Sequence, residues 1–131
     1  MQLILAYAAT LLVFVALDLT WLGLIAKGFY RGQLGALMLP QPQLFPAVAF
    51  YLMFPIGVVL FAALPGSRSG SVQRAALLGA AFGFFAYATY DLTNWATLRD
   101  WPVSLTFVDI MWGTCLTAAA AAAGCYALTR F

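Results

Sequence analysis

The sequence contains no histidine and no glutamate, and only 8% of its 131 residues are charged. The lack of histidine excludes histidine-ligated haem, the usual histidine-bearing zinc sites and a Ser-His-Asp catalytic triad. Neither haem nor zinc is therefore expected, and any other cofactor stays open. The formal net charge of +2 is small and scattered, which argues against nucleic acid as a partner. The two cysteines, Cys115 and Cys125, lie about 15 Å apart along one expected helix, too far for a disulfide bond.

Apolar residues dominate the composition. They make up 65% of the chain, whereas a soluble domain normally contains about 45 to 50%. Four apolar stretches are long enough to cross a membrane as helices, and the alternation typical of barrel strands is absent. These stretches are residues 2–26, 44–64, 75–98 and 104–128. We therefore predict an all-α fold, a membrane-spanning four-helix bundle that forms one transmembrane domain over residues 1–131.

The three connections differ in character. The first has a row of apolar residues at helical spacing, which fits either an interfacial helix between the first two spans or an ordinary loop; the row is Tyr30, Leu34, Leu37 and Met38. The second, residues 65–71, consists of turn formers and is expected to be a solvated linker. The third, residues 99–102, is so short that the last two spans should be antiparallel neighbours. Each side of the membrane receives three basic residues, so the direction of insertion stays open.

Three of the four acidic residues, Asp18, Asp91 and Asp109, lie inside the apolar spans. Counting from the connections on one side places each of them about 10 to 14 Å below that membrane surface. A carboxylate at such depth costs about 2.5 kcal/mol or more unless it is paired, protonated or facing an aqueous cavity. We expect the three to turn inward together. Because their negative charges repel one another, at least one should hold a proton at neutral pH.

Aromatic and polar residues share the helix faces of these aspartates at intervals of three and four positions. The resulting candidate ligand-binding residues, none of them assigned to a metal, are Asp18, Trp21, Tyr87, Tyr90, Asp91, Asn94, Asp109 and Trp112. Small residues are also spaced four apart, as Gly79 and Gly83 in the third span and Gly113, Thr117 and Ala121 in the fourth. Such surfaces let two helices approach closely, so we interpret them as packing surfaces.

Several short motifs suggest a family. They are residues 90–102 (YDLTNWATLRDWP), residues 109–113 (DIMWG), residues 18–21 (DLTW) and the pair Phe29 and Tyr30. With these motifs the chain resembles an uncharacterised family of small four-span bacterial membrane proteins, and the resemblance covers nearly its whole length. It implies a multi-pass protein of the bacterial inner membrane. It implies no activity and no site residues.

Three functions fit the sequence, and whether the protein is an enzyme stays open. The acids could bind, and with proton coupling transport, a small molecule or cation, with Trp21 and Trp112 supplying stacking or cation–π contacts. They could instead serve a membrane-embedded lipid-modifying enzyme, as acid and base or as ligands of a divalent cation. They could also be purely structural, or belong to an accessory membrane subunit. The expected partners are the lipid bilayer and a small-molecule, cation or lipid ligand, and a homodimer is compatible with the sequence.

Overall fold

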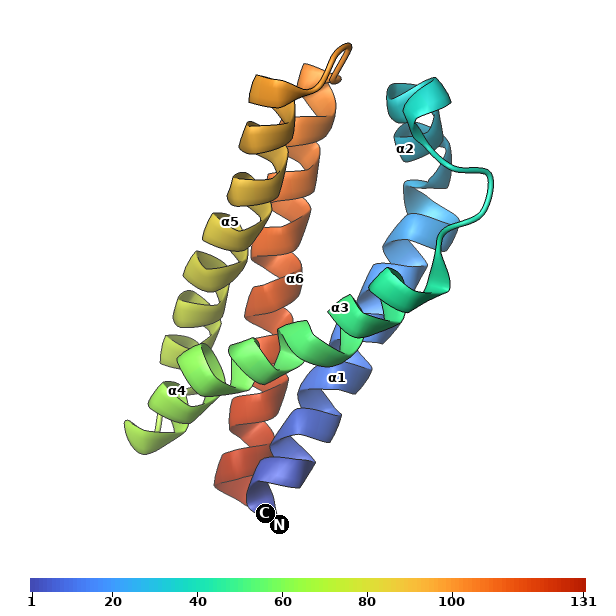
Figure 1. Cartoon of the computed structure of the whole chain (residues 1–131). Coiled ribbons are helices and arrows are strands. Elements are labelled where there is room, and N and C mark those ends of the chain that lie inside the picture. Colours follow the sequence, from blue (N-terminus) through green and yellow to red (C-terminus); the bar gives the residue numbers. More distant parts are fainter.

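The computed structural model describes residues 1–131, and all of its regular structure is helical (Figure 1). Four helices are long and apolar enough to cross a membrane, namely Gln2–Ile25, Leu44–Arg68, Val72–Thr97 and Val103–Arg130. The first consists of α1 (Gln2–Thr20) and a π-helical turn, η1 (Trp21–Ile25); the second of α3 (Leu44–Val58), the π-helical η3 (Val59–Ala63) and α4 (Leu64–Arg68). The last two are α5 (Val72–Thr97) and α6 (Val103–Arg130). The predicted all-α membrane bundle is confirmed.

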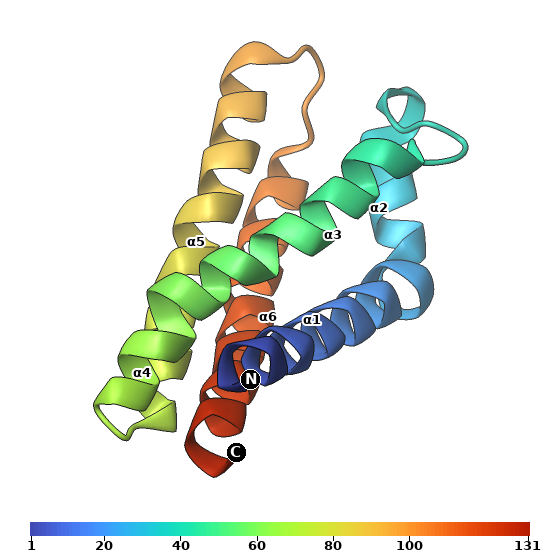
Figure 2. The ribbon, with the colours of Figure 1, turned by 60° about the horizontal axis from the view of Figure 1, so that its bottom comes forward.

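Helices α5 and α6 form the most extensive interface of the bundle and run antiparallel, as the short connection predicted. Helix α1 packs against α6, and the two chain termini lie close together at one end (Figure 1). Helix α3 runs obliquely across the bundle and its continuation, η3 and α4, packs against α5 (Figure 2). Helix α3 itself packs on α1, so that its first half diverges from α5.

Residues without bulky side chains bring α5 and α6 together. A Cβ atom at Gly79 would lie 2.5 Å from the Cβ of Ala121, and one at Gly83 would collide with Gly113 and Thr117. Because the helices are antiparallel, residues four apart on α5 meet residues four apart on α6 in reverse order. The small-residue positions therefore act as the packing surface that their spacing indicated.

The turn between α4 and α5 is shorter than the sequence indicated. We expected residues 65–71 to form a solvated linker, but the second membrane helix continues to Arg68. Pro65 lies inside this continuous helix, directly after the π-helical turn η3, and such a local change in helical hydrogen bonding accommodates the missing N–H of a proline in a membrane helix. Gly66 packs so closely on Ala75 that its Cβ would lie 2.5 Å from the Ala75 Cβ. Contact with α5 thus keeps these turn-forming residues helical.

The connection after the first span does form a helix, α2 (Lys27–Leu34), followed by one 3₁₀ turn, η2 (Gly35–Leu37). Only part of the apolar row expected here is buried. Tyr30 is buried, whereas Leu37 and Met38 are exposed. Tyr30 packs with Ala26, Trp101 and Leu105 in a small hydrophobic core between α2 and the start of α6. Ser104 also donates a hydrogen bond to Gln33 at 2.9 Å.

The main hydrophobic core lies in the middle of the bundle. Phe14 of α1, Val58 of α3 and Leu116 of α6 are fully or almost fully buried there. Towards the end that carries α2, large aromatic and acidic side chains replace this dense packing. The candidate site lies in that region.

Candidate functional site

Asp18 joins three helices. It lies near the end of α1 and is only 5% exposed. Its Oδ2 accepts a hydrogen bond of 2.5 Å from the hydroxyl of Tyr51 on α3, and its Oδ1 accepts one of 2.9 Å from the indole N–H of Trp112 on α6. Hydrogen bonds to a carboxylate are stronger than those between neutral groups. The two donors therefore offset part of the cost of removing Asp18 from water.

Asp109 on α6 lies at the other end of the site and accepts a hydrogen bond from α2. The hydroxyl of Tyr30 on α2 donates to its Oδ1 at 2.7 Å, and the indole N–H of Trp21 donates to the oxygen of that hydroxyl at 3.2 Å. Burial raises the pKa of the Tyr30 hydroxyl above its ordinary value, and the neighbouring carboxylate of Asp109 raises it further. The Tyr30 hydroxyl consequently keeps its proton and stays a donor.

The two tryptophans connect these two hydrogen-bonded groups. The rings of Trp21 and Trp112 are stacked, with centroids 4.5 Å apart and planes inclined by 10°. One indole N–H is directed to Asp18 and the other to Tyr30, the donor to Asp109. The sequence suggested that these rings would supply stacking or cation–π contacts to a ligand. In the structure they stack on one another and position the acidic residues.

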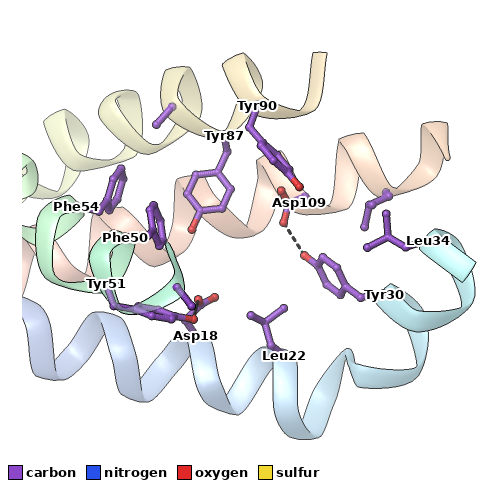
Figure 3. Close-up of a pocket in the computed structure, with 13 residues that line it drawn as sticks. Asp18, Leu22, Tyr30, Leu34, Phe50, Tyr51, Phe54, Tyr87, Tyr90 and Asp109 are labelled. Atoms are coloured by element: carbon purple, nitrogen blue, oxygen red, sulfur yellow. Dashed lines mark hydrogen bonds between the residues drawn. The ribbon is translucent and has the colours of Figure 1, made fainter. Parts of the chain in front are cut away.

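A cavity of about 480 Å³ lies between the two carboxyl groups (Figure 3). Five helices and the π-helical turn η1 contribute side chains to it. Its polar lining consists of Asp18, Asp109 and four tyrosines, Tyr30, Tyr51, Tyr87 and Tyr90. Its apolar lining is Leu22, Leu34, Ala47, Phe50, Phe54, Ala86 and Leu105.

Tyr87 and Tyr90 reach the cavity from α5. Figure 3 shows both rings projecting from this helix towards the side that carries Asp18 and Asp109. A Cβ at Gly113 would collide with the ring of Tyr87, so the glycine leaves room for this tyrosine between α5 and α6. Tyr90 is 57% exposed and therefore lies at the rim of the cavity, where its ring meets the edge of Trp101.

The eight residues selected from the sequence take three kinds of position. Asp18, Asp109, Tyr87 and Tyr90 line the cavity. Trp21 and Trp112 lie behind its acidic residues, as described above. Asn94 is half-buried further along α5, outside the lining. Asp91 is 0% exposed and lies outside the lining too, so the expected meeting of all three aspartates in one chamber is wrong for Asp91.

Sequence reasoning missed two donors that complete the site. Tyr51 escaped notice because α3 is apolar on all sides, so the spacing of its residues does not mark an inner face. Tyr30 was noted as part of an apolar row and of a family motif but not as a donor, and its contact with Asp109 spans 79 positions of sequence. The signal that could have found both is chemical, since a buried carboxylate needs donors and tyrosines at similar depth can supply them.

The cavity lining contains acidic residues but no basic ones. All six basic residues of the chain are exposed and none lines the cavity. No group of three acidic or cysteine side chains lies close enough together to hold a metal ion. What the cavity offers is two carboxyl groups, four phenol rings and apolar walls.

The fold, the four membrane-length helices and the exposed apolar surface define a multi-pass, all-α membrane protein surrounded by the lipid bilayer. The chain belongs to the family described as "Predicted membrane protein (DUF2177)", whose sequence model matches residues 3–126. This confirms the family resemblance inferred from the sequence motifs. No curated protein and no solved structure matches the chain. Family membership gives the membrane location and leaves the activity to be argued from the site.

Proposed function

We propose that this protein binds a small organic cation in the cavity between α1, α2, α3, α5 and α6, and exchanges it for a proton. The observation that carries the proposal is the lining of the cavity, in which Asp18 and Asp109 are the only charged residues and no basic residue is present. The resemblance described above supports placing this activity in the inner membrane of a bacterium.

The size of the cavity supports a small molecule. Its volume of about 480 Å³ falls within the range of about 300 to 1,000 Å³ that is usual for small-molecule sites. Its walls are mainly apolar, so an inorganic ion would lose its water shell there without gaining enough oxygen ligands. An alkyl or aryl ammonium loses much less hydration and can fill the apolar part.

The aromatic rings supply a second attraction. A cation over the face of a tyrosine ring gains about 0.5 to 2 kcal/mol, more when water is excluded. The rings of Tyr87 and Tyr51 lie on opposite sides of the cavity, on α5 and α3 (Figure 3). We place the positive group between them, within reach of Asp18 and Asp109, and the apolar body against Phe50 and Phe54.

Benzyltrimethylammonium and neopentylbenzene test the proposal, because they have the same shape and differ in one positive charge. The purified protein in lipid nanodiscs is titrated with each compound while its tryptophan fluorescence is recorded, since Trp21 and Trp112 lie directly behind the acidic residues. We expect saturable binding of the cation and at least about tenfold weaker binding of the neutral compound. Equal binding of both compounds would overturn the proposal.

Two variants locate the binding site. Replacing one carboxylate by its neutral amide, as in Asp18→Asn or Asp109→Asn, removes an ion–ion attraction of about 1 to 4 kcal/mol and should weaken cation binding about tenfold or more. Asp100→Asn is the matched control. Asp100 is exposed in the turn between α5 and α6 at φ 60°, a conformation that asparagine adopts readily. The control should bind the cation as the natural protein does.

Exchange is tested separately in proteoliposomes that contain a pH-sensitive dye. An inward gradient of benzyltrimethylammonium should drive protons out of liposomes that contain the natural protein, and this flux should be lost with Asp109→Asn. Cation binding without proton movement would reduce the function to binding alone. Neither binding nor flux would favour a purely structural role for the acids.

A further inference from the structure

Asp91 is the one intramembrane acidic residue that the cavity does not use. It is fully buried, and neither of its carboxyl oxygens has a hydrogen-bond partner. Most buried polar side-chain atoms in proteins have a partner, so an unpartnered carboxyl group calls for an explanation. An ionised carboxylate in this position would be desolvated and unpaired, which is strongly unfavourable.

The packing of α5 on α6 determines what Asp91 faces. Gly83 meets Gly113 and Thr117, and Tyr87, one turn further along α5, covers Gly113. The next turn of the same row carries Asp91, and the next turn of α6 carries Asp109. The register of the two helices therefore places the carboxyl groups of Asp91 and Asp109 next to one another across the contact of α5 with α6, and neither oxygen of Asp91 has a hydrogen-bond partner there.

No positive charge compensates this pair. By the register of the two helices, Asp91 faces Asp109 from α6, whereas Tyr90, the preceding residue of α5, lies at the cavity rim against Trp101. The indole of Trp101, from the nearby turn, donates to Thr106 and is not available to Asp91. The nearest basic residue along the chain, Arg99, is exposed beyond the end of α5. Two adjacent carboxyl groups without a cation retain a proton, because both cannot be ionised side by side.

We propose that Asp91 is the proton-binding site of this protein and that it communicates with the ligand cavity through Asp109. The inference rests on the proposed function and assigns separate tasks to the acids. Asp18 and Asp109 face the cation, whereas Asp91 holds, together with Asp109, the proton for which the cation is exchanged. When the cation arrives, its positive charge replaces that of the shared proton, and one proton leaves for each cation bound.

This stoichiometry predicts the pH dependence of binding. At low pH the pair is protonated and the cation must displace the proton, so the dissociation constant should rise by about tenfold for each unit by which the pH falls. In Asp91→Asn, Asp109 has no second carboxyl group with which to share a proton. This variant should therefore show a clearly smaller change of benzyltrimethylammonium affinity per pH unit than the natural protein. Asp100→Asn should keep the slope of the natural protein.

Proton release gives a direct second readout. In weakly buffered solution, addition of benzyltrimethylammonium should release about one proton per cation bound by the natural protein and almost none from Asp91→Asn. Asparagine has nearly the shape of a protonated aspartate, so the variant should fold. The natural protein also offers a test without substitution, because the infrared carbonyl band of a protonated carboxylic acid should weaken when the cation binds.

The outcomes separate the two proposals. If Asp91→Asn binds the cation with an unchanged pH slope and releases the same proton, the inference is overturned and the proposed function stands. If the natural protein shows no carboxylic acid band that responds to the cation, the inference is overturned as well. If the natural protein does not bind the cation at all, the proposed function fails first. Binding by Asp91→Asn with a clearly reduced pH slope and reduced proton release supports both.

Discussion

The hydrogen bond between Tyr51 and Asp18 offers a test of how the site is held together. Tyr51→Phe removes the hydroxyl that donates to Asp18 at 2.5 Å. The ring should stay in place, since its edge packs against Phe14 and Phe50 at centroid distances of 6.0 and 5.6 Å. The substitution therefore changes one hydrogen bond and little of the packing.

The expected cost follows from what Asp18 retains. A hydrogen bond to a charged group contributes about 1.5 to 3 kcal/mol, and one between neutral groups about 0.5 to 1.5 kcal/mol. After the change, Asp18 still accepts from Trp112 at 2.9 Å, so part of its charge stays compensated. We expect the free energy of unfolding to fall by about 2 kcal/mol.

Tyr7→Phe is the matched control. The hydroxyl of Tyr7 also joins α1 to α3, but it donates to the neutral backbone carbonyl of Leu52 at 2.8 Å in an exposed position. Its removal should cost about 1 kcal/mol or less. Both variants are compared by reversible unfolding in mixed micelles, with tryptophan fluorescence as the signal.

A double-mutant cycle assigns the cost to the carboxylate. In the Asp18→Asn background, Tyr51→Phe should cost clearly less than in the natural protein, with a coupling energy of at least about 0.5 kcal/mol. If Tyr51→Phe costs no more than Tyr7→Phe, or if its cost is the same in both backgrounds, the view that donors stabilise a charged Asp18 is refuted.

Two further predictions concern the walls of the cavity. Gly113→Ala should displace the Tyr87 ring and lower the free energy of unfolding by about 1 to 3 kcal/mol. The control is Gly28→Ala, where nothing lies within 4 Å of an added Cβ, and it should be neutral or stabilising. Equal unfolding free energies of the two variants would refute the close contact between Gly113 and Tyr87. Tyr30→Phe removes the donor to Asp109. Helix α2 should then detach from α6 more often, and trypsin should cleave α2 several-fold faster at its exposed basic residues. An unchanged cleavage rate would show that this hydrogen bond does not keep α2 on α6.

The fold was largely readable from the sequence because the bilayer imposes simple requirements. Apolar length identified the four spans, and the short connection at residues 99–102 established α5 and α6 as antiparallel neighbours. The limits of the second span were less predictable. Its helix extends through Pro65 and Gly66 because Gly66 contacts Ala75 on another helix, and that contact has no local signature.

The site was readable in part. Depth and helical spacing brought Asp18 and Asp109 to one chamber, but the same spacing could not distinguish the cavity from the seam between α5 and α6, where Asp91 lies. Nor could it show that Trp21 and Trp112 stack on one another, because that depends on the angle between α1 and α6. Contacts between helices decide such details, and a pattern within one helix does not record them.

The most direct test of the central claim is to locate a cation in the molecule. The protein is crystallised with 4-bromobenzyltrimethylammonium, and the bromine is found by anomalous scattering. We predict one strong bromine peak against the apolar wall formed by Phe50 and Phe54, with the ammonium group between Asp18 and Asp109. A cavity without the compound, or a compound bound only on the outer surface of the helices, would contradict the account.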